Sequence, residues 1–137
     1  MENKKPDLKA LLCCKDVLKN SRNPSVISII NIFNELRVSK FPLNIETICL
    51  VAIYGGAAGE FKHRFEIYEK DQKIGGTPDE TFFLENRNSI FHVIAYIDGL
   101  GVAEPKHFVI RSLIDGEVDG ETTLGIFKPF RPEESED

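Results

Sequence analysis

The sequence predicts an all-β protein, an antiparallel two-sheet β-sandwich (Ig-like or C2-like) of seven to eight strands. Short apolar runs rich in Ile, Val and Phe recur along the chain, and turn residues separate them. Pairs such as Asp115-Gly116 stand between neighbouring runs, as they do in tight hairpins. No segment keeps a helical period over the length that a stable helix needs.

Four strands are expected in the first half of the chain, at 8–14, 26–33, 48–54 and 61–68. A polar loop at 20–24 follows the first strand, and residues 16–19 are expected to form one helical turn before it. The run at 48–54 is apolar on both faces, which is typical of a central strand. The strand at 61–68 alternates most clearly, with Phe61, Phe65 and Ile67 on one face.

Three strands are expected in the second half of the chain, at 91–97, 108–114 and 122–127. Before them, residues 71–73 resemble a hairpin tip that leads into a brief strand near Ile74. Residues 78–83 are expected to form a helical turn, with Thr77 as its N-cap and Pro78 at its first position. Asp115-Gly116 predicts a two-residue hairpin loop.

The composition fits one domain. The chain has 137 residues, of which 42% are hydrophobic and 28% are charged. A chain of this size buries roughly two thirds of its unfolded surface, so it can form a core without disulfides. We expect a flexible N-terminus over 1–6, one sandwich domain over 7–128 and a solvated acidic tail over 129–137.

The cysteines and the apolar runs indicate a soluble cytoplasmic protein. Cys13, Cys14 and Cys49 are odd in number, and two of them are adjacent, which is a poor disulfide framework. No apolar segment of a secretory signal follows the N-terminus. The longest apolar run, 48–54, is far shorter than the ~20 residues of a membrane-spanning helix.

Several segments together resemble a widespread prokaryotic family of unknown function. These segments are Asp-Leu-Lys-Ala-Leu-Leu-Cys-Cys at 7–14, Ser-Ile-Ile-Asn-Ile-Phe-Asn at 28–34, Phe41-Pro42, and Gly55-Gly56 with Gly59-Glu60. They are similar to the patterns LKALLLCD, SLIGIF, FP and GGEGEH of that family, and the likeness continues more loosely to about residue 127. The resemblance implies a β-sandwich without an assigned activity. It supplies no catalytic or binding residues.

The sequence gives little support for a metal or cofactor site. The three histidines (His63, His92 and His107) and the cysteines lack the spacing of a zinc site. Asp115, Glu117 and Asp119 follow the opening of a calcium-binding loop, but its twelfth position is Ile126 instead of Glu. We interpret these acids as part of a soluble hairpin, with calcium as the less favoured alternative. No cofactor is predicted.

Catalytic motifs are not found either. Cys13 and Cys14 lie in an apolar strand, where a thiol is usually inert, and no Gly-x-Ser-x-Gly motif occurs. Paired carboxylates remain open as a catalytic arrangement, but nothing in the sequence selects a pair. The glycine-rich loop at 55–59 lacks the Lys-Ser or Lys-Thr of a phosphate loop. The sequence therefore predicts that the protein is not an enzyme.

The charge balance argues against nucleic acid as a partner. The chain carries 17 basic and 22 acidic residues, a net charge of −5, so no basic excess meets phosphates. The preferred function is a non-enzymatic binding or protein-interaction module. Its partner would be another protein or a second copy of the chain, and neither nucleic acid nor a membrane.

The expected interaction surfaces are one sheet edge and two loops, with the residues Gly55, Gly56, Gly59, Glu60, Asp98 and Glu104. The apolar runs at 26–30 and 48–54 are further candidates for homodimer contacts. One alternative function is a calcium- or small-ligand-binding sandwich that uses loop acids. A second alternative is an enzyme of unknown class.

Overall fold

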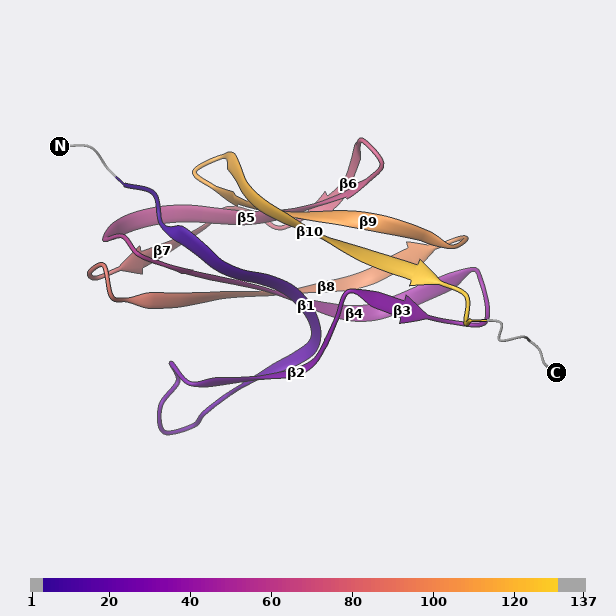
Figure 1. Ribbon diagram of the computed structural model, residues 1–137, viewed down its shortest axis with the longest axis horizontal. Coiled ribbons are helices and arrows are strands. Elements are labelled where there is room, and N and C mark those ends of the chain that lie inside the picture. The colour runs from indigo at the N-terminus through magenta and orange to yellow at the C-terminus, as the bar shows by residue number, and fades with distance from the viewer. Residues whose placement is uncertain (1–3, 131–137) are drawn as a thin grey trace.

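The expected sandwich is confirmed by the computed structural model, which describes residues 4–130 and contains ten strands and no helix over that range (Figure 1). One sheet has the strand order β2-β1-β4-β8. Its strands are β1 (Asp7–Lys19), β2 (Ile27–Phe33), β4 (Leu43–Gly55) and β8 (Ile90–Val102). Because the apolar side chains alternate along these strands, one face of the sheet is buried against the second sheet.

The second sheet has the strand order β3-β10-β9-β5-β6, and β7 also pairs with β5. Its strands are β3 (Glu35–Arg37), β5 (Gly59–Glu69), β6 (Gln72–Gly76), β7 (Glu80–Leu84), β9 (Lys106–Ile114) and β10 (Glu117–Phe127). Strand β3 runs parallel to β10, whereas the other pairs of both sheets are antiparallel. The sheet is therefore mixed. The strand number exceeds the expected seven to eight because β3 is too short to show a pattern in the sequence and β7 stands where a helical turn was expected, whereas the brief strand expected near Ile74 is β6.

The main core lies between the two sheets. Leu50 and Tyr54 of β4 face Phe65 of β5 and Ile110 of β9, and all four are buried. The two apolar faces of β4 have separate roles, because Cys49 and Val51 point to the opposite side. There they form a second apolar cluster, against which Ile27 and Ile29 of β2 pack. Figure 1 shows β1 curving out of the first sheet toward β2, which accounts for this second cluster.

Both expected helical turns are wrong. Residues 16–19 continue β1, and residues 80–84 form β7, which pairs with residues 59–63 of β5. The alternating burial of Phe82 and Leu84 stabilises a strand at this position, and Thr77 bonds to β5 instead of capping a helix. Tertiary pairing outweighs the local signal of Thr77-Pro78 here.

The hairpin turns follow the sequence closely. Asp115 and Gly116 join β9 to β10 with φ of 50° and 83°, as a type I′ turn requires. The β5–β6 tip is Lys70-Asp71, with Lys70 at φ 57°, so the expected tip at 71–73 lies slightly too late. Residues 1–3 and 131–137, which include most of the expected acidic tail, lie outside the described residues. Between residues 4 and 130 there is no helix of the length and apolarity that would cross a membrane.

Candidate functional site

A groove runs along one open side of the sandwich, between the edge strand β8 and the segment that links β6 to β7. Two neighbouring hollows of about 410 and 270 Å³ form it. Both are lined by Thr77, Pro78 and Tyr96, so they meet at these three residues. We call the two hollows together the edge groove. Residues 74–79, which are the end of β6 and the link from β6 to β7, are called the strap.

The sequence of the strap explains why it leaves the sheet here. The β5–β6 ladder ends where Gly76 pairs with Glu66, and Pro78 has no N–H to continue it. A Cβ atom at Gly76 would lie 2.6 Å from the carbonyl oxygen of Phe65, so only glycine permits this close approach. The strap therefore crosses the edge of β5 at the level of Phe65.

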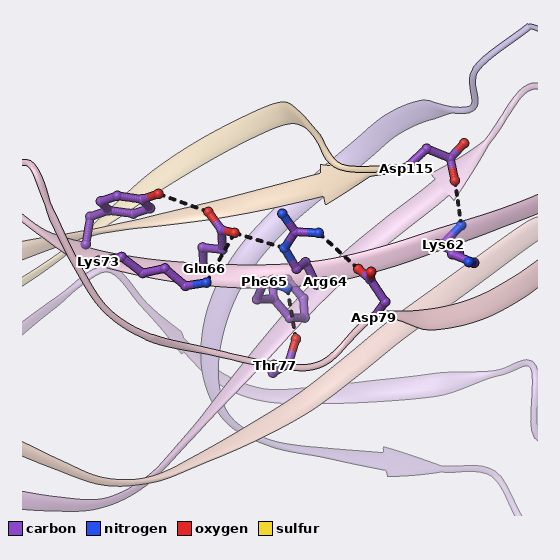
Figure 2. A network of polar contacts seen from close by, with 9 residues as sticks. Lys62, Arg64, Phe65, Glu66, Lys73, Thr77, Asp79 and Asp115 are labelled. Carbon is purple, nitrogen blue, oxygen red and sulfur yellow. Dashed lines mark hydrogen bonds and ion pairs between the residues drawn. The ribbon is translucent and has the colours of Figure 1, made fainter.

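Beyond the end of the β5–β6 ladder, three hydrogen bonds of Thr77 and Asp79 fasten the strap to β5 (Figure 2). The Thr77 N–H donates to the Phe65 carbonyl at 3.0 Å, and the Phe65 N–H donates to Thr77 Oγ1 at 2.9 Å. Further along, Arg64 Nη1 donates to Asp79 Oδ1 at 3.2 Å. One wall of the groove is thus held in place by the strand beneath it.

Arg64 also belongs to a polar network on the outer face of this sheet (Figure 2). Its Nε donates to Glu66 Oε2 at 2.9 Å, and the Tyr68 hydroxyl donates to Glu66 Oε1 at 3.0 Å. Lys73 Nζ lies 3.5 Å from the same carboxylate. Glu66 is only 6% exposed, and its hydrogen bond with Arg64 is the main reason that its pKa is lowered. The basic side chains next to the strap are therefore engaged outside the groove.

The opposite wall is strand β8. The Tyr96 hydroxyl donates to Asp16 Oδ1 at 2.7 Å, and Thr47 Oγ1 donates to Asp98 Oδ1 at 3.0 Å. The bond to Asp16 raises the pKa of Tyr96 to about 12, so the phenol stays protonated. Within the described residues β8 pairs with β4 alone, so its other edge presents backbone N–H and C=O groups to the groove side.

A buried polar chain borders the smaller hollow. His63 lines this hollow although it is only 2% exposed. Its Nε2 lies 2.7 Å from Ser112 Oγ, which lies 2.6 Å from the Tyr54 hydroxyl. Burial lowers the pKa of His63 to about 4, so the ring is neutral at pH 7. Ser112 has no exposed surface, so this Ser–His pair cannot present a nucleophile to a molecule in the groove.

The far end of this chain lies near Asp119. Burial raises the pKa of the Tyr54 hydroxyl most, its bond with Ser112 lowers it, and the nearby Asp119 carboxylate raises it again. Either hydroxyl of the Tyr54–Ser112 pair can be the donor, and the role of His63 Nε2 follows the tautomer of the ring. No protein partner occupies Nδ1 within residues 4–130.

The acids expected as a calcium alternative serve separate roles. Asp115 Oδ1 accepts the Lys62 N–H at 3.0 Å (Figure 2), Glu117 pairs with Lys5, and Asp119 lies near Tyr54. The part of the chain that the structure describes has no group of three or more His, Cys, Asp or Glu side chains that could hold a metal ion.

The expected interaction residues fall into separate places. Gly55, Gly56, Gly59 and Glu60 lie at or beside the turn between β4 and β5. The register pairs Gly55 with the first residue of β8 and Leu43 with its last, so Glu104 lies at the other end of the sandwich. Asp98 belongs to β8 instead of a loop, and it lines the larger hollow of the edge groove.

The sequence did not reveal the groove itself. Strand alternation places His63 on the face of Phe61 and Phe65, which agrees with its burial but gives no sign of the hollow beside it. The pair Gly75-Gly76 before Thr77-Pro78 is the one available signal, because glycines allow a close backbone approach and proline ends a ladder.

Comparisons with known proteins add one distant likeness. No family model matches the chain, and no curated protein matches it. Among solved structures, it is similar to Pseudomonas fluorescens alkylpurine DNA glycosylase AlkC bound to DNA containing an abasic site analog. The identity is 12%, the TM-score is 0.44, and the match covers 69% of this chain but only 28% of the glycosylase chain.

This neighbour contradicts two expectations from the sequence. The chain was expected to be a non-enzymatic module with protein partners and without nucleic acid, yet the similar structure is an enzyme bound to DNA. The net charge behind that expectation describes the whole chain and does not exclude a local contact with phosphates. We therefore withdraw the interaction module and the exclusion of nucleic acid. A likeness at this level does not transfer the glycosylase activity to this protein.

Proposed function

We propose that the protein binds a small organic molecule in the edge groove. The observation that carries this proposal is the neutral, buried imidazole of His63 beside a largely apolar groove. Ligand sites of proteins are concave, occupy about 300–1,000 Å³ and combine apolar walls with a few convergent polar groups. The larger hollow, of about 410 Å³, lies within this range, and the smaller one, of about 270 Å³, adjoins it.

The walls supply both kinds of contact. Ile67 and Ile74 on one side and Ile97 and Leu100 on the other offer apolar surface in the larger hollow. His63 and the open backbone edge of β8 offer hydrogen-bonding groups in the smaller one. A ligand with an apolar body and a polar end fits this division.

The hydrogen bonds to the walls support binding without rearrangement. Thr77 is bonded twice to Phe65, and Tyr96 is bonded to Asp16 on the far side of β4. A site whose walls are already fixed loses little conformational entropy when a ligand binds. The groove is therefore suited to a small molecule more than to a ligand that requires the sandwich to open.

The test is a fragment screen on the full chain, followed by amide chemical shifts. We expect fragments that move the resonances of Gly75, Gly76 and Tyr96 together. Gly75→Trp should abolish these shifts, because a side chain at Gly75 enters open space in the larger hollow without backbone strain. Gly101→Trp is the matched control, because Gly101 also faces open space but does not line either hollow.

Two results would overturn the proposal. In the first, no fragment shifts the groove residues of the folded protein. In the second, fragments bind the Gly75→Trp and Gly101→Trp proteins with equal affinity, which would place their site elsewhere.

A further inference from the structure

One nitrogen of the buried His63 ring is left without a protein partner. Its Nε2 lies 2.7 Å from Ser112 Oγ, whereas no residue between 4 and 130 bonds to its Nδ1. The ring is only 2% exposed, yet it lines the smaller hollow of the edge groove. Because buried polar atoms are normally hydrogen-bonded, Nδ1 is a point at which a ligand can supply the missing bond.

The neighbouring rings hold the imidazole in place. The Phe65 ring meets the His63 ring edge to face, with 4.5 Å between the ring centroids, and the Tyr54 ring does so at 5.7 Å. These contacts and the bond of Nε2 to Ser112 together fix the plane of the imidazole. The unpartnered nitrogen is therefore oriented before a ligand arrives, which limits the entropy that binding costs.

The buried chain of hydrogen bonds can run in two directions. In the first, Tyr54 donates to Ser112 and Ser112 donates to His63 Nε2, so the ring proton is on Nδ1. In the second, Nε2–H donates to Ser112 and Ser112 donates to Tyr54, whose own hydrogen can turn toward the nearby Asp119. Each direction keeps both bonds of the chain. Nδ1 is a donor in the first direction and an acceptor in the second.

The surroundings of the ring disfavour a charged group on the ligand. Among the described residues, no Lys or Arg lines either hollow, so an anion would find no cation to pair with there. Burial lowers the pKa of His63 and keeps its ring neutral at pH 7. The same loss of water would act on a charged group that meets Nδ1, whereas a neutral donor or acceptor avoids most of this cost.

We infer that the ligand of the edge groove is an uncharged apolar molecule whose polar group bonds to His63 Nδ1, and that the chain through Ser112 and Tyr54 lets this nitrogen meet either a donor or an acceptor. This inference rests on the proposed function and specifies its ligand class. A neutral nitrogen heterocycle is the simplest molecule of this kind. Tyr54 has no exposed surface and lines neither hollow, so it is a positioning residue that acts on the ligand through His63.

The test uses three flat probes of similar size: indole, which carries an N–H donor, quinoline, which carries an acceptor nitrogen, and indene, which carries neither. Amide shifts of the full chain at pH 7 give their dissociation constants, and the nitrogen-15 shifts of the His63 ring show which nitrogen carries the proton. We expect indole and quinoline each to bind roughly three- to tenfold more tightly than indene, the gain of one hydrogen bond. Indole should increase the fraction of the protein with the proton on Nε2, and quinoline the fraction with the proton on Nδ1.

A variant tests the chain without touching the groove. In Tyr54→Phe the second direction leaves the Ser112 hydrogen without an acceptor, whereas the first direction keeps the bond from Ser112 to Nε2. The ring proton should therefore move to Nδ1, and indole should bind roughly three- to tenfold more weakly while quinoline is unchanged. Tyr68→Phe is the matched control, because it removes a hydroxyl that is bonded to Glu66 on the outer face of the sheet, and it should change neither affinity.

The outcomes separate this inference from the proposed function. If indene binds as tightly as the other probes, if only charged fragments bind, or if indole and quinoline leave the His63 proton where it is, the contact with Nδ1 is wrong and the small-molecule site stands. If both probes favour the same tautomer, or Tyr54→Phe weakens both equally, the reversible chain is wrong. The tautomer measurement needs only the parent protein, so it decides this point even where Tyr54→Phe does not fold. If no probe or fragment moves the groove residues, the proposed function fails and the ligand class fails with it.

Discussion

Thr77 and Phe65 exchange two hydrogen bonds at the point where no strand pairs with the open edge of β5. Strand β7 pairs with residues 59–63 and β6 pairs with residues 66–69, so Phe65 lies in the gap between them. The Thr77 N–H reaches the Phe65 carbonyl at 3.0 Å, and Thr77 Oγ1 accepts the Phe65 N–H at 2.9 Å. One residue of the strap thus completes the ladder and also forms part of the groove wall.

This relationship predicts a loss of stability in Thr77→Val. Valine keeps the shape of the side chain but leaves the Phe65 N–H without an acceptor, which costs about 1–3 kcal/mol in a buried setting. Thr77→Ser keeps the hydroxyl and should stay within about 0.5 kcal/mol of the parent protein. Urea unfolding of the three proteins measures the difference. Equal midpoints for the Val and Ser variants would show that the side-chain bond does not stabilise the strap.

The sequence predicted the longer strands, in which apolar residues either alternate or follow one another without interruption. The strand at 61–68 is contained in β5, and the run at 48–54 is contained in β4, where both apolar faces are buried as a central strand requires. The type I′ turn at Asp115-Gly116 also followed from residue types alone, because both positions need positive φ. In these cases the local preference and the tertiary structure agree.

The expectations that were wrong, and the features that were not expected, depend on contacts between segments that lie far apart in the chain. The local sequence of one segment does not show which other segment it pairs with. Residues 78–83 have a capping signal, but β7 forms because β5 offers an open edge next to them. The groove forms because the edge of β8 and the strap beside β5 lie on the same side of the sandwich. No sequence motif predicts that arrangement of the two sheets. His63, Ser112 and Tyr54 come from three different strands, so their hydrogen bonds appear only once both sheets are assembled.

The buried His63 predicts that the protein loses stability in mild acid. Its pKa is about 4 in the folded state against an ordinary value of 6.5, so the unfolded chain binds a proton first as the pH falls. The contribution of His63 to stability is therefore constant above about pH 7 and decreases between about pH 6.5 and 4, by up to about 3 kcal/mol. Denaturant unfolding at a series of pH values measures this slope.

A variant separates the contribution of His63 to this slope from that of other groups that titrate in a similar pH range. His92 also has a lowered pKa, through burial and then Lys19, so it adds to the same slope. The carboxylates of Asp16 and Glu66 have lowered pKa values, and their contribution is lost at a lower pH. His63→Gln should flatten the slope between about pH 6.5 and 4.5. An unchanged slope in His63→Gln would contradict a neutral buried ring.

The three cysteines should resist thiol reagents in the folded protein. Cys13 is 2% exposed, and Cys14 and Cys49 have no exposed surface. Burial is the main reason that the pKa values of Cys13 and Cys49 are raised to about 12, and it also raises that of Cys14. The thiolate is the reactive form, so modification should proceed at the rate of unfolding, and all three thiols should react at once in denaturant. Fast labelling of one cysteine without denaturant would show that its strand opens locally.

The two adjacent glycines of the strap predict opposite responses to alanine. At Gly76 a Cβ atom would lie 2.6 Å from the Phe65 carbonyl oxygen, which is backbone and cannot move aside cheaply. Gly76→Ala should therefore destabilise the protein by about 1–3 kcal/mol. At Gly75 a Cβ atom meets nothing within 4 Å, so Gly75→Ala should be neutral or stabilise by up to about 1 kcal/mol, because alanine restricts the unfolded chain more than glycine does.

The same pair tests whether the strap sets the shape of the groove. Gly76→Ala can fold only if the strap moves away from β5, which weakens the two bonds between Thr77 and Phe65 and displaces Pro78 from the meeting point of the hollows. Amide exchange at Thr77 should then be faster in Gly76→Ala than in Gly75→Ala, and fragment binding should be weaker. If Gly76→Ala matches Gly75→Ala in stability, exchange and binding, the close approach of the strap to Phe65 does not form the groove wall.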